Sequence, residues 1–96
     1  LWFALVVVAP LSEETLFRGF LFRGILHSKA GIAGAILLPA LLWASIHLQY
    51  DLYGIGTIFA GGCLLAAARL QSGSLWVPLF LHSLMNFIAT LEAALL

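Results

Sequence analysis

The sequence predicts an all-α fold, a polytopic bundle of about four transmembrane helices. Of the 96 residues, 64% are hydrophobic and 8% are charged, whereas an ordinary soluble domain carries roughly 25% charged residues. So few charges cannot cover a water-facing surface of this size. Strands are excluded because period-two alternation is absent and because a lone sheet leaves backbone groups unsatisfied in lipid. The net charge is zero, which gives no electrostatic basis for binding nucleic acid.

The first predicted helix covers residues 1–27 and is apolar except for one polar stretch. Pro10 is expected either to kink this helix or to begin a second half-helix that is capped by Ser12. In the second case Glu13 and Glu14 would occupy the first turn of the new helix, where acidic side chains interact favourably with the helix dipole.

Three further apolar helices are predicted at residues 31–47, 54–69 and 75–96. They are separated by the polar turns HSKAG, LQYDLYG and QSGS, and each is near the ~20 residues that cross a bilayer core. Helix 54–69 is rich in small residues, which allow membrane helices to approach closely. Residues 1–96 are interpreted as one domain. Because the chain does not begin with Met, we expect it to be a core segment of a longer membrane protein.

Three charged side chains, Glu13, Glu14 and Arg18, interrupt the first helix. A charged residue at the centre of a membrane helix costs about 2.5–3.5 kcal/mol. Glu14 and Arg18 are four residues apart, so they share a helix face and are expected to form an ion pair that removes much of this cost. Glu13 lies about 100° around the helix. Ionisable groups inside a membrane usually face the bundle interior, so we expect an inward-facing polar cluster.

Two other predicted helices also carry strong polar groups. His47 follows Trp43 by four residues, and Asn86 follows His82 by the same spacing, so each pair points from one side of its helix. At 1.5 Å per residue, these groups and Glu13 overlap in the middle third of the bilayer. We therefore expect one polar cavity between the helices. Its side chains are Glu13, His47, His82 and Asn86.

The side chains of this predicted cavity are suited to hydrolysing an amide bond. A carboxylate and a neutral imidazole near one water can activate it as a nucleophile. His82 and Asn86 can donate hydrogen bonds to one point, as a tetrahedral oxyanion requires. The alternative is a zinc site made by Glu13, His47 and His82, with water in the fourth position. The sequence has no HExxH or similar close ligand spacing, and both possibilities stay open.

Three short motifs carry a resemblance to a known family. "EETLFR" resembles the EExxxR motif of the CAAX prenyl protease and bacteriocin-processing (CPBP, or Abi) family of intramembrane proteases. "WASIH" is similar to that family's second motif, an aromatic residue four positions before a histidine, and "HSLMN" resembles its HxxxN motif. The motifs occur in the family's order, and Glu13, His47 and His82 are separated by 34 and 35 residues. Trp43 departs from the pattern, in which phenylalanine is commoner.

The resemblance implies hydrolysis of a peptide bond within the membrane by a multi-pass membrane protein. By position, Glu13 and His47 would activate the attacking water. His82 and Asn86 would form the oxyanion site.

The resemblance also implies how the site is held and what it requires. Glu14 and Arg18 would hold the arrangement together. The implied mechanism is a glutamate mechanism without a cofactor, with zinc as the alternative. The implied partners are membrane lipid and a peptide or protein substrate, with lipidated chains among the candidates.

Two other classes of function remain compatible with the same residues. A non-catalytic membrane protein, such as a peptide-binding scaffold or an immunity protein, would use the cluster to hold a peptide and would tolerate loss of Glu13. A transporter would use glutamate and histidine as a proton relay, and it would show ion flux without cleaving a substrate.

Overall fold

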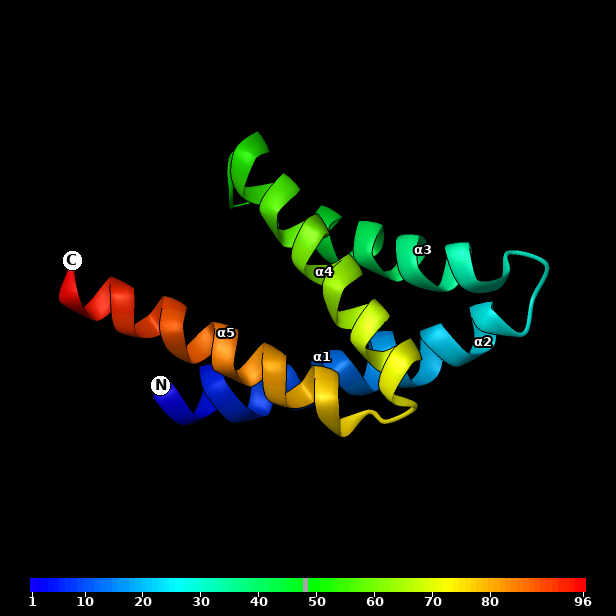
Figure 1. Ribbon diagram of the computed structural model, residues 1–96. Helices are drawn as coiled ribbons and strands as arrows, with labels where there is room; N and C mark the ends of the chain where they lie inside the picture. Colours follow the sequence, from blue (N-terminus) through cyan, green and yellow to red (C-terminus); the bar gives the residue numbers. More distant parts are fainter. Residues whose placement is uncertain (48) are drawn as a thin grey trace.

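A computed structural model describes residues 1–47 and 49–96 of the chain. The described residues form helices joined by short turns, and they contain no strand. The molecule measures 45 × 28 × 18 Å along its principal axes, and both termini lie at the same end of its long axis (Figure 1). The predicted all-α fold class is therefore confirmed.

The first helical segment runs without a break from Ala4 to Leu26 and includes two stretches of π-helix. Ser12 lies inside this segment, where its hydroxyl donates to the carbonyl of Val8 at 2.9 Å. The predicted half-helix capped by Ser12 is therefore wrong, because the hydroxyl bonds back to the preceding turn and not forward to free N–H groups. The parts of the segment are η1 (Ala4–Val8), α1 (Ala9–Glu14), η2 (Thr15–Leu21) and α2 (Phe22–Leu26).

Three separate helices follow the first segment, which gives the four predicted helical stretches. Two of them, α4 and α5, are long and apolar enough to cross a membrane, and α3 is a shorter apolar helix. Their bounds are Gly31–Ser45 for α3, Leu52–Ser72 for α4 and Trp76–Leu95 for α5.

Local capping explains where α4 differs from its predicted bounds. The Asp51 carboxylate accepts a hydrogen bond from the Gly54 N–H at 2.8 Å, so the helix begins before Gly54. The helix ends at Gly73, whose φ of 66° is left-handed and is accessible to glycine at low cost. The turn predicted at residues 48–54 includes Leu48, which lies outside the described residues.

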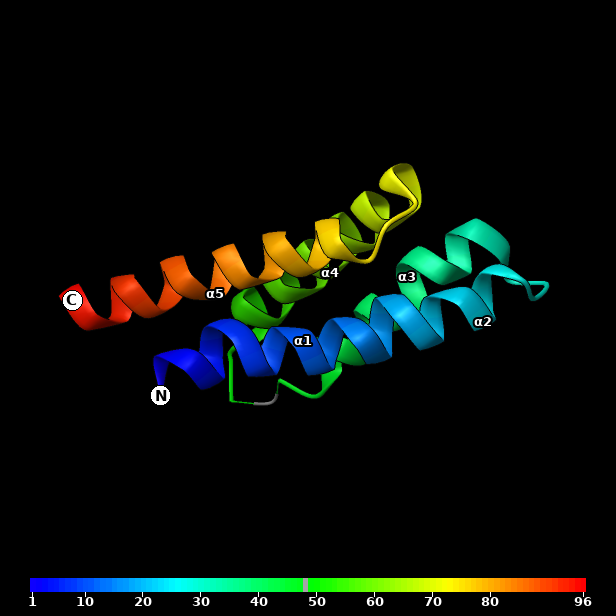
Figure 2. The same cartoon turned by 90° about the horizontal axis from the view of Figure 1, so that it is seen from below.

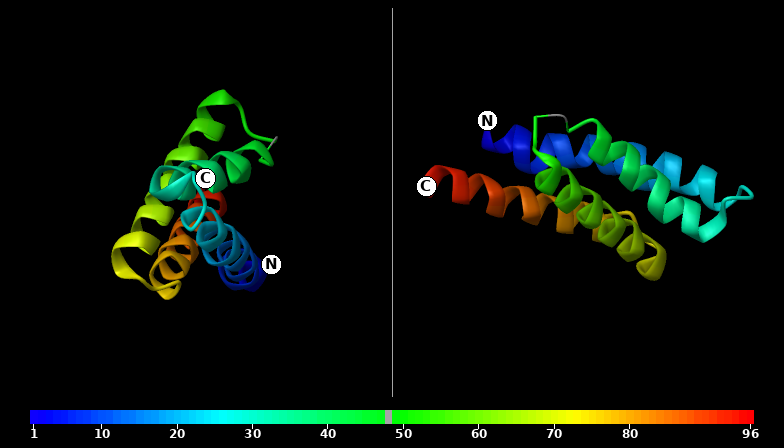
Figure 3. Two further views of the ribbon diagram at one scale, coloured as in Figure 1. Left: turned by 90° about the vertical axis from the view of Figure 1, so that its right-hand side faces the viewer. Right: turned by 90° about the horizontal axis from the view of Figure 1, so that it is seen from above.

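The first segment is shared between two packing partners. It contacts α5 through η1 and α1, and it contacts α3 through η2 and α2. α4 packs mainly against α3 and also against α5 (Figure 2). Figure 3 shows the first segment and α5 running side by side in opposite directions. The buried apolar side chains form two small clusters between these helices: Phe17, Trp43 and Leu65, and Phe22, Ala35 and Ala66.

The distribution of side chains is the reverse of that in a soluble domain. Glu14 and Arg18 are 0% exposed and His82 is 2% exposed, whereas Phe20 and Phe80 are 73% and 68% exposed. Soluble proteins rarely bury charged residues fully, and membrane proteins turn such groups toward the bundle interior. The apolar surface is thus available to lipid, and the polar groups are gathered inside.

Candidate active site

Glu14 lies at the centre of the buried polar cluster. Its Oε2 accepts hydrogen bonds from Arg18 Nη1 at 3.1 Å and from His82 Nδ1 at 2.6 Å. The predicted ion pair between Glu14 and Arg18 is therefore present. Because a carboxylate oxygen only accepts, Nδ1 is the donating nitrogen of His82. The sequence analysis did not anticipate this contact between Glu14 and His82, which joins the first segment to α5.

Arg18 connects the first segment to α3 and α4. Its Nη2 donates to the carbonyl of Gly62 at 2.7 Å, and its guanidinium lies 5.1 Å from the ring centroid of Trp43. This approach depends on the missing side chain at Gly62, because a Cβ there would lie 3.0 Å from both Arg18 Nη2 and the Cβ of Ala40. The expected packing role of glycine in the third predicted span is thus confirmed at Gly62.

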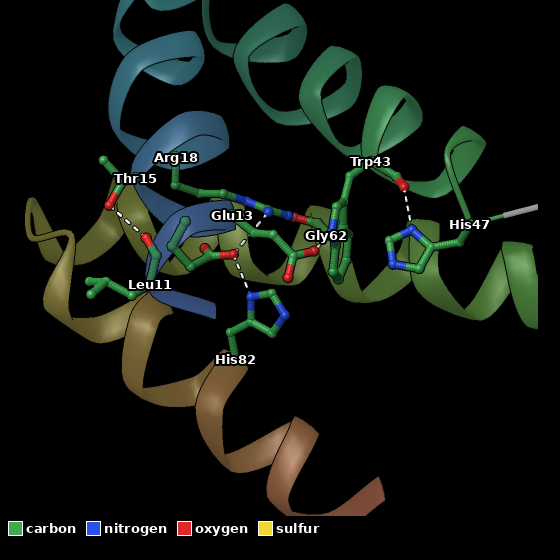
Figure 4. A network of polar contacts seen from close by, with 9 residues as sticks. Leu11, Glu13, Thr15, Arg18, Trp43, His47, Gly62 and His82 are labelled. Atoms are coloured by element: carbon green, nitrogen blue, oxygen red, sulfur yellow. Dashed lines mark hydrogen bonds and ion pairs between the residues drawn. The ribbon is translucent and has the colours of Figure 1, made fainter. Parts of the chain in front are cut away.

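Glu13 has a different partner from Glu14. Its Oε1 accepts a hydrogen bond from Trp43 Nε1 at 2.7 Å. The Trp43 ring also meets the rings of His47 and His82 edge-on, with centroid distances of 5.3 and 5.2 Å (Figure 4). Sequence reasoning missed this role of Trp43. The signal was its departure from the family pattern, because tryptophan, unlike phenylalanine, carries an N–H donor.

His47 lies just beyond the C-terminus of α3, which ends earlier than predicted. Its Nδ1 is 2.6 Å from the carbonyl oxygen of Trp43. A carbonyl only accepts, so Nδ1–H is the donor and Nε2 of the neutral ring keeps a lone pair. The last carbonyls of a helix lack helical partners. Here the His47 ring supplies a donor for the Trp43 carbonyl, because the His47 backbone N–H donates to the Ala44 carbonyl instead.

Asn86 of α5 is anchored on the first segment. Its Nδ2 donates to the carbonyl of Leu5 at 2.9 Å. That carbonyl is free because the Ala9 N–H donates to the Ala4 carbonyl and because Pro10 has no N–H. An amide nitrogen carries two N–H groups, so one remains for another acceptor. The proline of the first segment thus exposes the backbone group that holds Asn86.

One pocket of about 910 Å³ brings the four predicted catalytic side chains together. It lies between the first segment, the end of α3, α4 and α5. Its wall combines these polar groups with apolar side chains from the terminal parts of the first segment and α5. The polar lining includes Glu13, His47, His82 and Asn86, together with Trp43. The expected common cavity therefore exists, and the catalytic role of each residue stays a prediction.

The alternative zinc set, Glu13, His47 and His82, is not gathered around one point among the described residues. Among the described residues, which include Glu13, His47 and His82, no three His, Cys, Asp or Glu side chains lie close enough together to hold a metal ion. The hydrogen bonds of these three side chains do not decide the question, because they engage only Oε1 of Glu13 and Nδ1 of each histidine, and a zinc-bound histidine commonly donates its other ring N–H in this way. Metal dependence itself stays a prediction that metal analysis of the protein tests.

An apolar helical bundle with a buried glutamate and histidine pocket defines the chain as part of a membrane protein with an internal polar site. The family model described as type II CAAX prenyl endopeptidase Rce1-like matches residues 1–88. The chain belongs to this family.

Two relatives extend the comparison. An Escherichia coli protein named "Uncharacterized 24.3 kDa protein" is 38% identical over 80 residues, covering 79% of this chain and 36% of the relative. A Bacillus subtilis (strain 168) protein named "Putative membrane peptidase YdiL" is 31% identical over 80 residues, covering 83% of this chain and 32% of the relative. The chain thus spans about a third of the length of these relatives. No solved structure matches the chain.

Proposed function

We propose that the protein is a multi-pass intramembrane endopeptidase that hydrolyses a peptide bond with water activated by Glu13 and His47. His82 and Asn86 stabilise the oxyanion in this proposal. The observation that carries it is the convergence of these four side chains, from the first segment, the turn after α3, and α5, on one pocket inside an apolar bundle. Membership of a family of CAAX prenyl endopeptidases supports the same reaction class.

Water activation follows from the hydrogen bonds that Glu13 and His47 already make. Glu13 receives the Trp43 N–H on Oε1, and among the described residues no hydrogen bond occupies its Oε2. His47 donates through Nδ1 to the Trp43 carbonyl, which leaves Nε2 as an acceptor. Two acceptors facing one pocket can each receive one O–H of a single water. Trp43 orients both groups, one through its indole N–H and the other through its backbone carbonyl.

The reaction itself balances with these groups and one water. The water oxygen forms a bond to the carbonyl carbon of the substrate as Glu13 takes a proton from that water. The tetrahedral oxyanion then collapses, the C–N bond breaks, and the proton held by Glu13 passes to the leaving amine. The products are a carboxylic acid and an amine, and the acid then passes its proton to the amine or to water. His82 is 2% exposed and the adjacent Glu14 is fully buried, and this burial strengthens the electrostatic interactions at that side of the site.

His82 and Asn86 supply the oxyanion donors. Asn86 uses one N–H on the Leu5 carbonyl and has a second for the oxyanion. His82 donates through Nδ1 to Glu14, so donation through Nε2 requires a ring with protons on both nitrogens. The Glu14 carboxylate supplies the matching negative charge. Losing one oxyanion donor typically costs ~10²–10³ in rate.

The shape of the pocket suits a peptide that is apolar next to the scissile bond. Beyond the polar groups, its wall is formed by residues such as Leu1, Trp2, Met85 and Ala89. A segment of a membrane protein or a lipidated chain end has this chemistry. The proposed substrate is therefore a peptide or protein held at the membrane, with lipidated chains among the candidates.

A matched pair of variants tests the proposal in the whole protein reconstituted in lipid vesicles. Glu13→Gln keeps the size of the side chain and removes its charge, so cleavage of membrane peptides should stop while peptide binding is retained. Glu92→Gln is the control, because Glu92 is an exposed carboxylate of α5 outside the pocket; it should cleave like the wild type. Peptide binding without cleavage by the wild type would indicate a scaffold or immunity protein, and ion flux without cleavage would indicate a transporter.

A further inference from the structure

A second pocket lies at the opposite end of the bundle from the chain termini. It has a volume of about 690 Å³ and is lined by the outer face of η2 and α2, the end of α4 and the turn before α5. None of the predicted catalytic residues lines it. Its lining is Thr15, Gly19, Phe20, Arg23, Gly24, His27, Arg69 and Leu75.

This pocket is cationic at its outer end. Arg23 and His27 come from the first segment and its following turn, and Arg69 comes from the last turn of α4. Among the residues that the structure describes, no carboxylate lines the pocket. Glu13 and Glu14 have partners in the candidate active site, so they do not neutralise these cations.

Arg69 is held in place but keeps hydrogen-bonding capacity. Its guanidinium carbon lies 5.4 Å from the centroid of the Phe22 ring, which is within the range of a cation–π contact. Its Nε is buried and has no hydrogen-bond partner among the described residues. A guanidinium presents donors in a planar fork that matches phosphate oxygens. An anion with several oxygens is therefore the ligand that this end of the pocket favours.

The inner part of the same pocket is apolar, and its glycines leave it without bulky side chains. The lining positions from Thr15 to His27 follow one helix face, and the part before the first basic residue, Thr15 to Phe20, spans about 8 Å at 1.5 Å per residue. Gly19 and Gly24 lie along this strip, and a Cβ built on Gly24 would meet nothing within 4 Å. A free phosphate would use only the cationic end. A phospholipid would use both parts, with its phosphate at the cations and an acyl chain along the strip.

We propose that this pocket binds one anionic phospholipid. The guanidinium groups of Arg23 and Arg69 contact the phosphate, and His27 contributes an N–H donor. The acyl chain lies along Gly19, Gly24 and the exposed ring of Phe20. The bound lipid covers a concave part of the surface at the end of the bundle, where headgroups lie.

Native mass spectrometry of the whole protein in detergent tests the binding with three probes. These are dimyristoyl phosphatidylglycerol, dimyristoyl phosphatidylcholine with the same acyl chains and no net charge, and inorganic phosphate. The proposal expects tight, saturable binding of one phosphatidylglycerol and much weaker binding of the other two. Equal affinity for the two lipids, or binding of phosphate as tight as that of phosphatidylglycerol, would overturn it.

Matched variants locate the site. Arg23→Gln should weaken phosphatidylglycerol binding roughly fivefold, the effect expected from one basic group near an anionic headgroup. Lys29→Gln removes the same charge at the same end of the bundle but outside the pocket lining, so its effect should be clearly smaller. An equal loss in the two variants would mean general attraction to basic residues and would refute the site.

A steric variant separates the site from charge effects. Gly24→Leu should fill the apolar strip and abolish the one-to-one complex without changing net charge. Gly56→Leu is the control, because Gly56 lies on α4 with open space around it and outside this pocket. Unchanged phosphatidylglycerol affinity in Gly24→Leu would place the lipid elsewhere.

Discussion

Among residues 1–47 and 49–96, Arg18 and the His82 ring are the basic groups that contact the buried Glu14 carboxylate, and replacing Arg18 by methionine leaves the ring alone. Both members of the Glu14–Arg18 pair are fully buried. Breaking a buried ion pair by removing one partner typically costs about 3–5 kcal/mol, because an uncompensated charge remains. The Gly62 carbonyl also loses its donor from Arg18, which adds to the cost. Methionine recovers part of the lost packing. We therefore expect the free energy of unfolding to fall by about 3–5 kcal/mol.

Equilibrium unfolding of the whole protein in micelles of a neutral detergent without phospholipid measures this change. The matched control is Arg23→Met, because Arg23 lies on the same helical segment but is exposed; its effect should stay within about 0.5 kcal/mol. A double variant, Glu14→Gln with Arg18→Met, removes both charges and should recover part of the loss, since a buried pair replaced by neutral groups is often close to neutral in stability. If Arg18→Met were no more destabilising than Arg23→Met, the pair would be solvated and the reasoning refuted.

Three further substitutions test the packing and the site. Gly62→Ala should lower the free energy of unfolding by about 1–3 kcal/mol, because the new Cβ would lie 3.0 Å from Ala40 and Arg18. Gly56→Ala should be neutral or slightly stabilising. Equal thermal stability of the two variants would contradict this reasoning. Trp43→Phe should lower the cleavage rate by removing the N–H that orients Glu13, and an unchanged rate would remove that role. Asn86→Ala should lower the catalytic rate about 10²-fold with little change in peptide binding, and a loss confined to binding would argue against an oxyanion role.

Interactions within one helix were predictable from the sequence. Glu14 and Arg18 are four residues apart, and any helix brings such a pair together. The cost of charge in lipid also predicted that these groups face inward with the two histidines. Fold class followed from composition, because so few charged residues cannot form a soluble surface.

Interactions between helices were not predictable in the same way. His82 contacts Glu14 and not Glu13 because of the way each helix is rotated about its axis. In a soluble helix a continuous apolar stripe sets this rotation. Here a few polar side chains mark the inward face of a helix, and they set its rotation only coarsely. The free Leu5 carbonyl that anchors Asn86 depends on a local π-helical register, which Pro10 suggests but does not specify.

Cleavage rate and metal content, measured on the same purified sample of the whole protein, test the central claim most directly. The proposed mechanism predicts full cleavage by wild-type protein that contains no bound metal. It also predicts no cleavage by Glu13→Gln, which should still bind the peptide. Stoichiometric zinc that is lost together with activity on chelation, and restored with it, would contradict the proposed water activation. Undiminished cleavage by Glu13→Gln would remove Glu13 from the reaction altogether.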